Sequence, residues 1–265
     1  MKSVYKHYSQ WPHALPQEVA IAVEVNGINY AVMMASPFDL EDFALGFLYT
    51  EQVIKAPHDL HNIELITTEQ GISLQVQIAN RRVPQLQTKL RHVRGTSGCG
   101  ICGVAALEHV FGDLKKLPSN ESFTDGLPNN LKQRCFDFQQ QTKAKTTQAS
   151  EAVHAAFWLT ASNEIELCRE DIGRHNAVDK LIGALLKNKT NLQIGALVVT
   201  SRCSVELVQK AIIAKIATLI SFASPSTLAV KMALAHNLQL IHIPKTDIPI
   251  LYTHKLLSSP CEKSP

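Results

Sequence analysis

Two cysteines three positions apart, Cys99 and Cys102, carry the most reactive chemistry in this sequence. They lie in residues 94–103, a stretch that holds four of the chain's twelve glycines. Glycine lacks a Cβ atom, so such a loop bends freely and can approach another molecule closely. Three basic side chains add positive charge beside the sulfur atoms, which favours the thiolate form: Arg91, His92 and Arg94. A short helix predicted over residues 104–110 would add its N-terminal N–H groups, so the pattern predicts an exposed nucleophile.

Two other roles for a pair with this spacing stay open. A structural zinc site needs a second pair of ligands at similar spacing, and the remaining cysteines are isolated from one another: Cys135, Cys168, Cys203 and Cys261. A thioredoxin-like exchange site follows a buried apolar strand, whereas residues 86–94 are basic and mostly polar. We therefore expect no structural metal, and a dithiol oxidoreductase is the enzymatic alternative.

Composition limits the broad class of protein. The chain has 265 residues, 45% of them hydrophobic, and a formal net charge of +3. That charge is too small to indicate nucleic-acid binding, but it suits an anionic ligand held by a few arginines. The N-terminus lacks a signal-peptide pattern, and no stretch reaches the roughly eighteen apolar residues of a membrane span. We expect a cytoplasmic protein without a membrane or nucleic-acid partner, whose thiols a reducing compartment keeps available.

The first half of the chain is predicted to be rich in strands. Residues 17–35 alternate around Asn26-Gly27, a dipeptide typical of tight hairpin turns. A helix is expected over residues 36–48, and a second strand pair over 63–67 and 72–78. Proline, glycine and asparagine gather in residues 117–130, and a helix with Leu131 on its apolar stripe follows. The sequence therefore predicts an N-terminal domain, residues 1–128, and a second domain, residues 129–265.

The second half alternates strands and helices. Strands are predicted over residues 154–160, 164–168, 196–200, 218–222 and 238–243, and helices over 176–186, 204–215 and 226–236. This alternation predicts an α/β domain with a mostly parallel sheet and helices on both faces. Ligands bind such sheets beyond the carboxyl ends of the strands.

A second dense group of polar residues, 168–180, lies at a predicted strand-to-helix junction. Arg174 from this group and Arg202 from a neighbouring strand end could clasp a phosphate with their planar N–H groups. The alternative is structural: Asn176 caps the helix, Asp179 completes a capping box, and Arg174 is solvated.

These motifs together resemble the FdhD family of formate dehydrogenase accessory sulfurtransferases, over about residues 17–254. The resemblance rests on segments that occur in the family's order: residues 25–27, 31–37, 40–47, 98–103, 153–156, 169–177, 201–202 and 252–254. It implies a three-layer cytidine-deaminase-like C-terminal domain and a smaller strand-rich N-terminal α+β domain. It also implies an enzyme, a sulfurtransferase that accepts persulfide sulfur from a cysteine desulfurase and passes it to the molybdenum bis-guanylyl molybdopterin cofactor before formate dehydrogenase receives it.

The resemblance also assigns residues and partners. Cys99 is expected to carry the persulfide, whereas Cys102 receives the sulfur, helps to release it, or guards against overoxidation. The cofactor, a bound substrate, is expected at one loop: Ile243, Pro244, Lys245, Thr246, Asp247 and Ile248. The implied partners are the desulfurase, the formate dehydrogenase apoenzyme and the cofactor's guanine nucleotide moiety, and a twofold homodimer would suit a cofactor with two guanylyl arms. A non-enzymatic module that only escorts the cofactor is the other alternative.

The deaminase-like fold raises the question of deaminase activity. Zinc deaminases need His-x-Glu and Cys-x-x-Cys motifs at two helix starts. Ala177 stands where the glutamate is required and Glu206 where the second cysteine is required, so we expect neither deaminase chemistry nor a metal. The 243–248 loop departs from the family pattern, because only Lys245 keeps its charge. Cys203 is predicted to be a small buried residue, and His154 to pack at a strand start.

Overall fold

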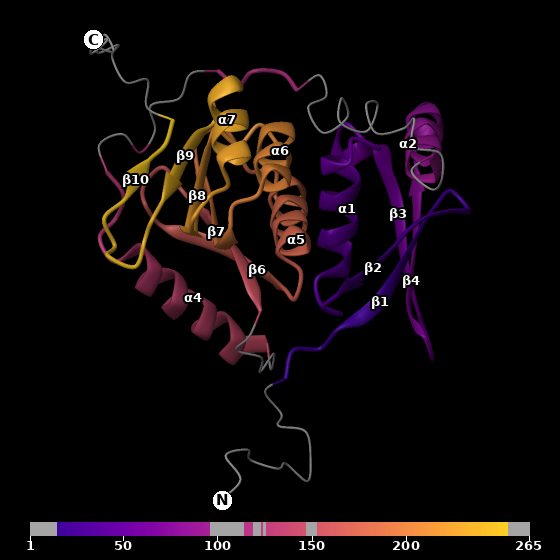
Figure 1. The fold of residues 1–265 in the computed structure, drawn as a ribbon. Coiled ribbons are helices and arrows are strands. Elements are labelled where there is room, and N and C mark those ends of the chain that lie inside the picture. The colour runs from indigo at the N-terminus through magenta and orange to yellow at the C-terminus, as the bar shows by residue number, and fades with distance from the viewer. Residues whose placement is uncertain (1–14, 96–113, 119–122, 124–125, 147–152, 254–265) are drawn as a thin grey trace, which may run out of the picture.

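The computed structural model describes residues 15–95, 114–118, 123, 126–146 and 153–253. The strands form two sheets. Helices pack between the two sheets, and a further helix lies outside the second sheet (Figure 1). Cys99, Cys102 and the helix predicted over residues 104–110 lie outside the described residues.

The first sheet has four strands: β1 (Val19–Val25), β2 (Ile28–Ala35), β3 (Leu60–Thr68) and β4 (Gly71–Ile78), in the order β2-β1-β4-β3. The predicted hairpin is confirmed, because Asn26 and Gly27 take the positive φ angles that its turn requires, 50° and 77°. The Asn26 side chain also accepts a hydrogen bond from the Ile78 N–H, at 2.8 Å. The turn residue thus ties the hairpin to β4, which runs parallel to β1.

Helix α1 (Leu40–Thr50) covers one face of this sheet, as its apolar spacing predicts. Phe43 and Leu48 are fully buried, and the rings of Phe43 and Phe47 stack with centroids 5.4 Å apart. Helix α2 (Val83–Gly95) follows β4 and buries Leu86 in the same core. Its mostly polar sequence did not predict a helix. Two short 3-10 helices, η1 (Pro57–Asp59) and η2 (Asn80–Arg82), complete this part of the chain.

A buried carboxylate joins these two 3-10 helices. The Asp59 side chain is fully buried and lies 2.7 Å from both Arg81 and Arg82, and it also accepts hydrogen bonds from the N–H groups of Lys55 and Ala56. Burial alone would raise the pKa of Asp59, but the hydrogen bonds from Lys55 and the two guanidinium groups outweigh it and hold the pKa below its usual range.

We expect Asp59→Asn to lower the free energy of unfolding by about 2 kcal/mol at neutral pH, because Arg81 and Arg82 lose their ion-pair partner. The loss is no larger because both arginines are partly solvated. A depressed pKa stabilises the fold above the unfolded pKa of about 4, so the difference from wild type should shrink as pH falls below that value. Denaturant unfolding at neutral pH and near pH 3 measures both effects. Glu64→Gln, at an exposed position of β3, is the matched control and should change little; an Asp59 variant as stable as wild type would refute the assignment.

The second sheet has six strands: β5 (His154–Leu159), β6 (Ile165–Asp171), β7 (Ala196–Arg202), β8 (Thr218–Ala223), β9 (Gln239–His242) and β10 (Ile250–Leu251). Their order is β10-β9-β8-β7-β5-β6. The expectation of a mostly parallel sheet is wrong: β7, β8 and β9 are parallel, but the β5–β6, β5–β7 and β9–β10 pairs are antiparallel. Residues 160–164 connect β5 to β6 and residues 243–249 connect β9 to β10. Both connections are too short for the crossover that parallel neighbours need.

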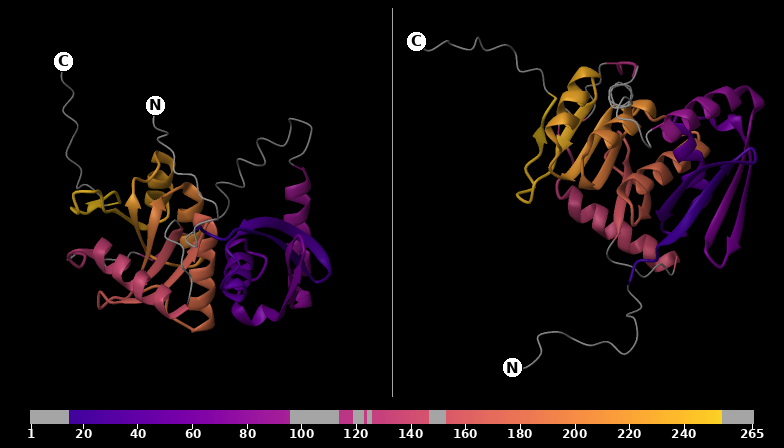
Figure 2. Two further views of the ribbon diagram at one scale, coloured as in Figure 1. Left: turned by 90° about the horizontal axis from the view of Figure 1, so that it is seen from below. Right: turned by 45° about the vertical axis from the view of Figure 1, so that its right-hand side comes forward.

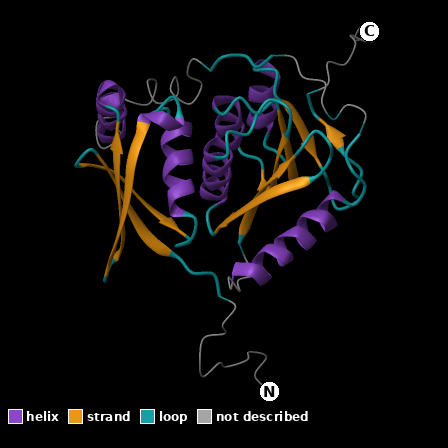
Figure 3. Ribbon diagram, turned by 180° about the vertical axis from the view of Figure 1, so that it is seen from behind, coloured by secondary structure: helices purple, strands orange, loops and turns teal. Residues whose placement is uncertain are grey.

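Helices cover both faces of this sheet, as predicted. Helices α5 (Arg174–Lys187), α6 (Val205–Ile213) and α7 (Thr227–Ala235) bury their apolar residues against one face. Helix α4 (Leu131–Thr146) lies across the other face, where Leu131 and Cys135 are buried against β5, β7 and β8 (Figure 3). The α/β class, the two sheets and the three layers of the C-terminal half are confirmed.

Helices α1 and α5 join the two halves at close range (Figure 2). A Cβ atom on Gly46 would lie 1.8 Å from the Asp179 carbonyl oxygen. The backbones of α1 and α5 therefore meet at Gly46 and at Gly183, the facing glycine of α5. Two buried lysines bridge the same interface. Lys180 donates to the Ser36 carbonyl at 3.0 Å, and Lys210 donates to the Thr50 hydroxyl at 2.9 Å. Their charges are balanced within the second half by Asp171 and Asp179. The domain boundary between residues 128 and 129 stays a prediction.

Candidate functional site

The described loops that carry predicted site residues lie at the carboxyl edge of the second sheet. Strands β6 and β7 are both antiparallel to β5, and β7, β8 and β9 are parallel, so all four end at the same edge. Helices α5, α6 and α7 begin there, and the β9–β10 loop turns there. This is where ligands bind in open α/β sheets, and it contains every described residue of the predicted site.

The described cysteines are buried. Cys135, Cys168 and Cys203 are at most 5% exposed, and burial raises the pKa of the Cys135 and Cys203 thiols to about 12. Cys203 is therefore the small buried residue that the sequence predicts. Thiols with such pKa values stay protonated near neutral pH and do not act as nucleophiles. The predicted nucleophile Cys99 and its neighbour Cys102 lie outside the described residues, so their roles stay predictions.

Two helices present N-termini at this edge without side-chain caps. The N-cap residue of α5 is Gly173, which has no side chain, and that of α6 is Ser204, whose hydroxyl accepts no hydrogen bond from the helix backbone. In α7, by contrast, the Ser226 hydroxyl accepts one from the Ala229 N–H at 3.1 Å. Free N–H groups at a helix start favour anions. Because α5 begins at Arg174, the structural alternative in which Asn176 caps this helix is wrong.

His175 links the starts of α5 and α6. Its Nε2 lies 3.5 Å from the Ser204 hydroxyl and 3.6 Å from Glu206 Oε2. Burial and the neighbouring Arg174 charge lower the pKa of the imidazole, so the ring is neutral near pH 7. A hydrogen bond from Ser204 lowers the pKa of Glu206. The neutral His175 imidazole and the Ser204 hydroxyl thus lie beside the ionised carboxylate of Glu206.

Arg174 and Arg202 reach this edge from different elements, as predicted. Arg174 is the first residue of α5, and Arg202 is the exposed last residue of β7. Arg174 Nε is buried and has no hydrogen-bond partner among the described residues. Burial and the same guanidinium lower the pKa of His154, which begins β5 as expected. At this edge, the guanidinium groups of Arg174 and Arg202 therefore form no ion pair with a carboxylate of the described chain.

Most of the polar group at residues 168–180 serves the joint between the two halves instead. Arg169 binds Asp42 of α1 at 2.7 Å. Asp171 accepts hydrogen bonds from the Ser36 N–H at 3.0 Å and the Gly173 N–H at 2.7 Å, besides its ion pair with Lys180. Arg169, Asp171 and Lys180 therefore stabilise the joint, because their charged groups lie against the first half.

The predicted cofactor loop forms the connection between β9 and β10. Ile243 is buried, Pro244 is half-buried, and the four residues after them are exposed: Lys245, Thr246, Asp247 and Ile248. Lys132 from the start of α4 donates to the Pro244 carbonyl and lies 3.2 Å from Asp247. Asp247 is thus partly neutralised, which the sequence did not reveal. Lys245 remains as the exposed cation of the loop.

Within the described residues, no group of three or more His, Cys, Asp and Glu side chains is placed to hold a metal ion. Ala177 is buried inside α5, and Glu206 contacts His175 as described above. None of the helices in the described ranges is long and apolar enough to cross a membrane.

Comparison with known proteins gives consistent matches over most of the chain. The FdhD/NarQ family profile matches residues 16–257. The Sulfur carrier protein FdhD of Cupriavidus necator is 37% identical over 243 residues, which cover 92% of this chain and 83% of the relative. The protein of the same name from Bordetella parapertussis is 39% identical over 90% of this chain and 84% of the relative. The one from Xanthomonas campestris is 38% identical over 89% of this chain and 83% of the relative.

One solved structure shares the fold. It belongs to a chain from Desulfotalea psychrophila that carries the designation formate dehydrogenase accessory protein. The two structures superpose with a TM-score of 0.62 at 20% sequence identity, over 91% of this chain and 88% of the other. At that identity the likeness speaks for the architecture alone.

Proposed function

Because the chain belongs to the FdhD/NarQ family, we propose that it is a sulfur carrier in the maturation of formate dehydrogenase. The burial of the cysteines and their positions relative to the family match support this proposal. Three of the six cysteines are buried, which leaves Cys99, Cys102 and Cys261 for exchange. Of these, only the Cys99–Cys102 pair lies within the matched residues 16–257.

The proposed reaction is a sulfurtransferase step at Cys99. Its thiolate attacks the outer sulfur of a persulfide on a cysteine desulfurase. A new S–S bond forms on Cys99, the donor's S–S bond breaks, and the donor cysteine leaves as a thiolate. Cys99 then presents the outer sulfur to the acceptor. Intact mass after incubation with cysteine and a desulfurase tests this role: one added sulfur atom supports it, and an unchanged mass overturns it.

The proposed acceptor is the molybdenum bis-guanylyl molybdopterin cofactor, bound as a substrate at the carboxyl edge before formate dehydrogenase receives it. The edge suits the phosphates of its guanine nucleotide arms. The start of α5, whose N-cap residue has no side chain, and Arg174 Nε, which has no partner among the described residues, offer donors to a phosphate. Lys245 in the β9–β10 loop adds an exposed positive charge.

This assignment predicts that GDP binds the protein and that Arg202→Ala weakens the binding by about tenfold, as expected for a partly solvated guanidinium–phosphate contact. Affinity should also fall as salt rises, because exposed phosphate contacts are screened. Calorimetry with GDP at two salt concentrations measures both effects. Lys231→Ala, which removes an exposed cation inside α7, is the matched control and should bind like wild type. Equal affinity of the Arg202 variant and wild type would remove Arg202 from the site.

A further inference from the structure

A cavity of about 550 Å³ opens at the joint between the two halves, away from the site described above. It lies at the C-terminal end of α5, and the 14 residues of that helix place this end about 20 Å from the carboxyl edge. Ligand sites in proteins have volumes in this range, are mostly apolar and often lie between domains. The cavity is therefore a candidate binding site that the proposed sulfur transfer does not use.

Both halves of the chain form the apolar walls of this cavity. Leu45 of α1 is buried, and Leu60 and Ile63 of β3 are half-buried against the same core. Leu186, near the end of α5, packs against the cores of both halves. Pro57 completes the apolar lining. The close contact between the backbones of α1 and α5 fixes these walls relative to each other, so the cavity is formed before any ligand binds.

The apolar surface continues from the cavity along the edge strand β3. Ile63 is the register partner of Val76, which is buried in the core under α1. Leu65, two residues later, pairs with Leu74 of the same core, so both side chains point to the face that α1 covers. Leu65 is nevertheless 44% exposed, because β3 is the last strand of its sheet. An elongated apolar strip of this kind suits an extended chain better than a compact ring.

The rim of the cavity carries one cation without a counter-ion. Lys187 lies 3.0 Å from Glu41 and 3.8 Å from Asp42, so its charge is balanced. Lys189 is exposed at the same rim, and no carboxylate of the described chain forms an ion pair with it. His58, the other titratable residue of the rim, adds no negative charge. A negative group would therefore find a partner in Lys189 and meet no unbalanced carboxylate.

We propose that this cavity binds an unbranched aliphatic carboxylate, with its chain along Leu45, Ile63 and Leu186 and its carboxylate at Lys189. Burial of the chain supplies most of the affinity, about fourfold for each methylene group removed from water. The exposed contact between lysine and carboxylate adds about two- to fivefold. The ligand touches both halves, so its binding also stabilises the joint between them. This site is independent of the proposed sulfur carrier activity.

Calorimetry with hexanoate, octanoate and decanoate, each below its micelle concentration, tests the apolar part of the site on the full chain. Affinity should rise by about fourfold for each added methylene group. Ile63→Gln should weaken octanoate binding by about tenfold, because it removes apolar contact with the chain. Ile66→Gln is the matched control and should bind octanoate like wild type, because Ile66 is a 39% exposed isoleucine on the opposite face of β3.

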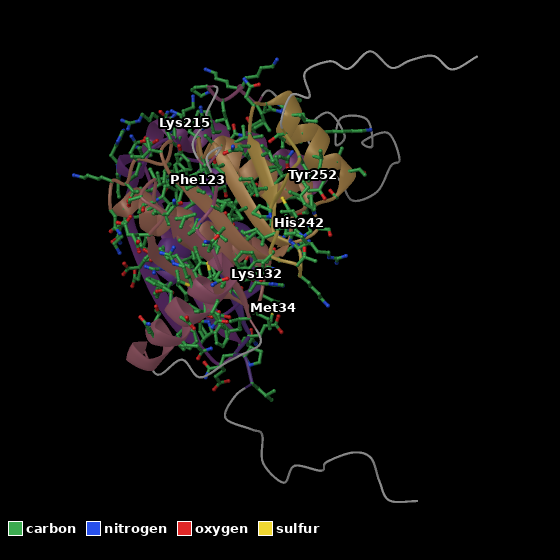
Figure 4. The ribbon with its side chains drawn as sticks, turned by 90° about the vertical axis from the view of Figure 1, so that its left-hand side faces the viewer. Met34, Phe123, Lys132, Lys215, His242 and Tyr252 are labelled. Carbon is green, nitrogen blue, oxygen red and sulfur yellow. The ribbon has the colours of Figure 1, made fainter. Side chains whose placement is uncertain are left out.

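The head group is tested at Lys189. Lys189→Ala should weaken octanoate binding by about two- to fivefold and leave the binding of octanol unchanged, and rising salt should reduce the effect. Lys215→Ala is the matched control (Figure 4). Lys215 is exposed and follows α6 as Lys189 follows α5, with φ angles of 61° and 56°, but it does not line the cavity. The Lys215 variant should bind octanoate like wild type.

Each contrary outcome overturns a defined part of the inference. If none of the three carboxylates binds, or if affinity does not rise with chain length, the cavity is not an aliphatic site. If Ile66→Gln weakens binding as much as Ile63→Gln, the ligand binds elsewhere on the molecule. If Lys189→Ala weakens octanoate and octanol equally, the carboxylate does not lie at Lys189. Thermal unfolding without ligand verifies that every variant is folded, and none of these results depends on the sulfur-transfer assays.

Discussion

Cys99→Ala is expected to abolish formate dehydrogenase maturation while leaving the fold intact. The reason is chemical: a persulfide carrier needs an accessible thiolate, and alanine has no sulfur to attack the donor. The three described cysteines cannot substitute, because they are buried inside the second half and the pKa values of two of them are about 12. The expected loss is therefore complete rather than partial.

Intact mass spectrometry and a maturation assay measure this effect directly. After incubation with cysteine and a desulfurase, wild type should gain sulfur and the Cys99 variant should not. Cys261→Ala is the matched control, because it removes a cysteine beyond the family match and should behave like wild type. Normal maturation of formate dehydrogenase by Cys99→Ala would show that Cys99 is not the carrier.

The same protein samples separate sulfur transfer from the two other roles of the cysteine pair. A dithiol oxidoreductase would reduce insulin at a useful rate, and a zinc knuckle would hold one metal ion per chain after treatment with a chelator. We expect both assays to be negative while the persulfide forms. A module that only escorts the cofactor would bind GDP without gaining sulfur.

The parts of the fold that local sequence specifies could be predicted. Asn26-Gly27 defines its hairpin because only a few residue types accept two consecutive positive φ angles. Apolar spacing predicted helix α1, although the helix spans Leu40–Thr50 and not residues 36–48, and it also predicted the strands of the second half. Helix α2 was missed because Leu86 is the one buried apolar side chain among residues 83–90, the part of the helix whose side chains are described. The pairing of β1 with β4 is set by contacts distant in sequence.

The site was predictable only where neighbouring residues define it. The strand ends bring Arg174 and Arg202 to one edge, as the α/β pattern requires. The partners of Arg169 and Asp171, by contrast, are Asp42 and Ser36, more than 120 positions away, so their structural role was invisible in the sequence. The same applies to Lys132, whose contact with the Pro244 carbonyl spans 112 positions.

The joint between the halves should be the most sensitive part of the described fold. Alanine at either Gly46 or Gly183 is expected to lower the free energy of unfolding by about 4 kcal/mol. This loss is expected even though the helix propensity of alanine is about 1 kcal/mol more favourable than that of glycine. A Cβ atom on Gly46 would lie 1.8 Å from the Asp179 carbonyl oxygen, and one on Gly183 would lie 1.9 Å from that of Asp42. Backbone atoms cannot move aside alone, so the two helices must separate.

Separating α1 from α5 also breaks the polar contacts that cross the joint, including the 2.7 Å hydrogen bond from Thr50 to Asp179. Denaturant unfolding of both single variants and the double variant tests this. Since either methyl group alone forces the helices apart, the second should cost less than the first, and the double variant should be less destabilised than the sum. Lys187→Ala removes an exposed ion pair with Glu41 at the rim of the same joint and should change stability by less than about 1 kcal/mol. Additive losses, or single variants as stable as wild type, would mean that the helices do not depend on each other's glycine.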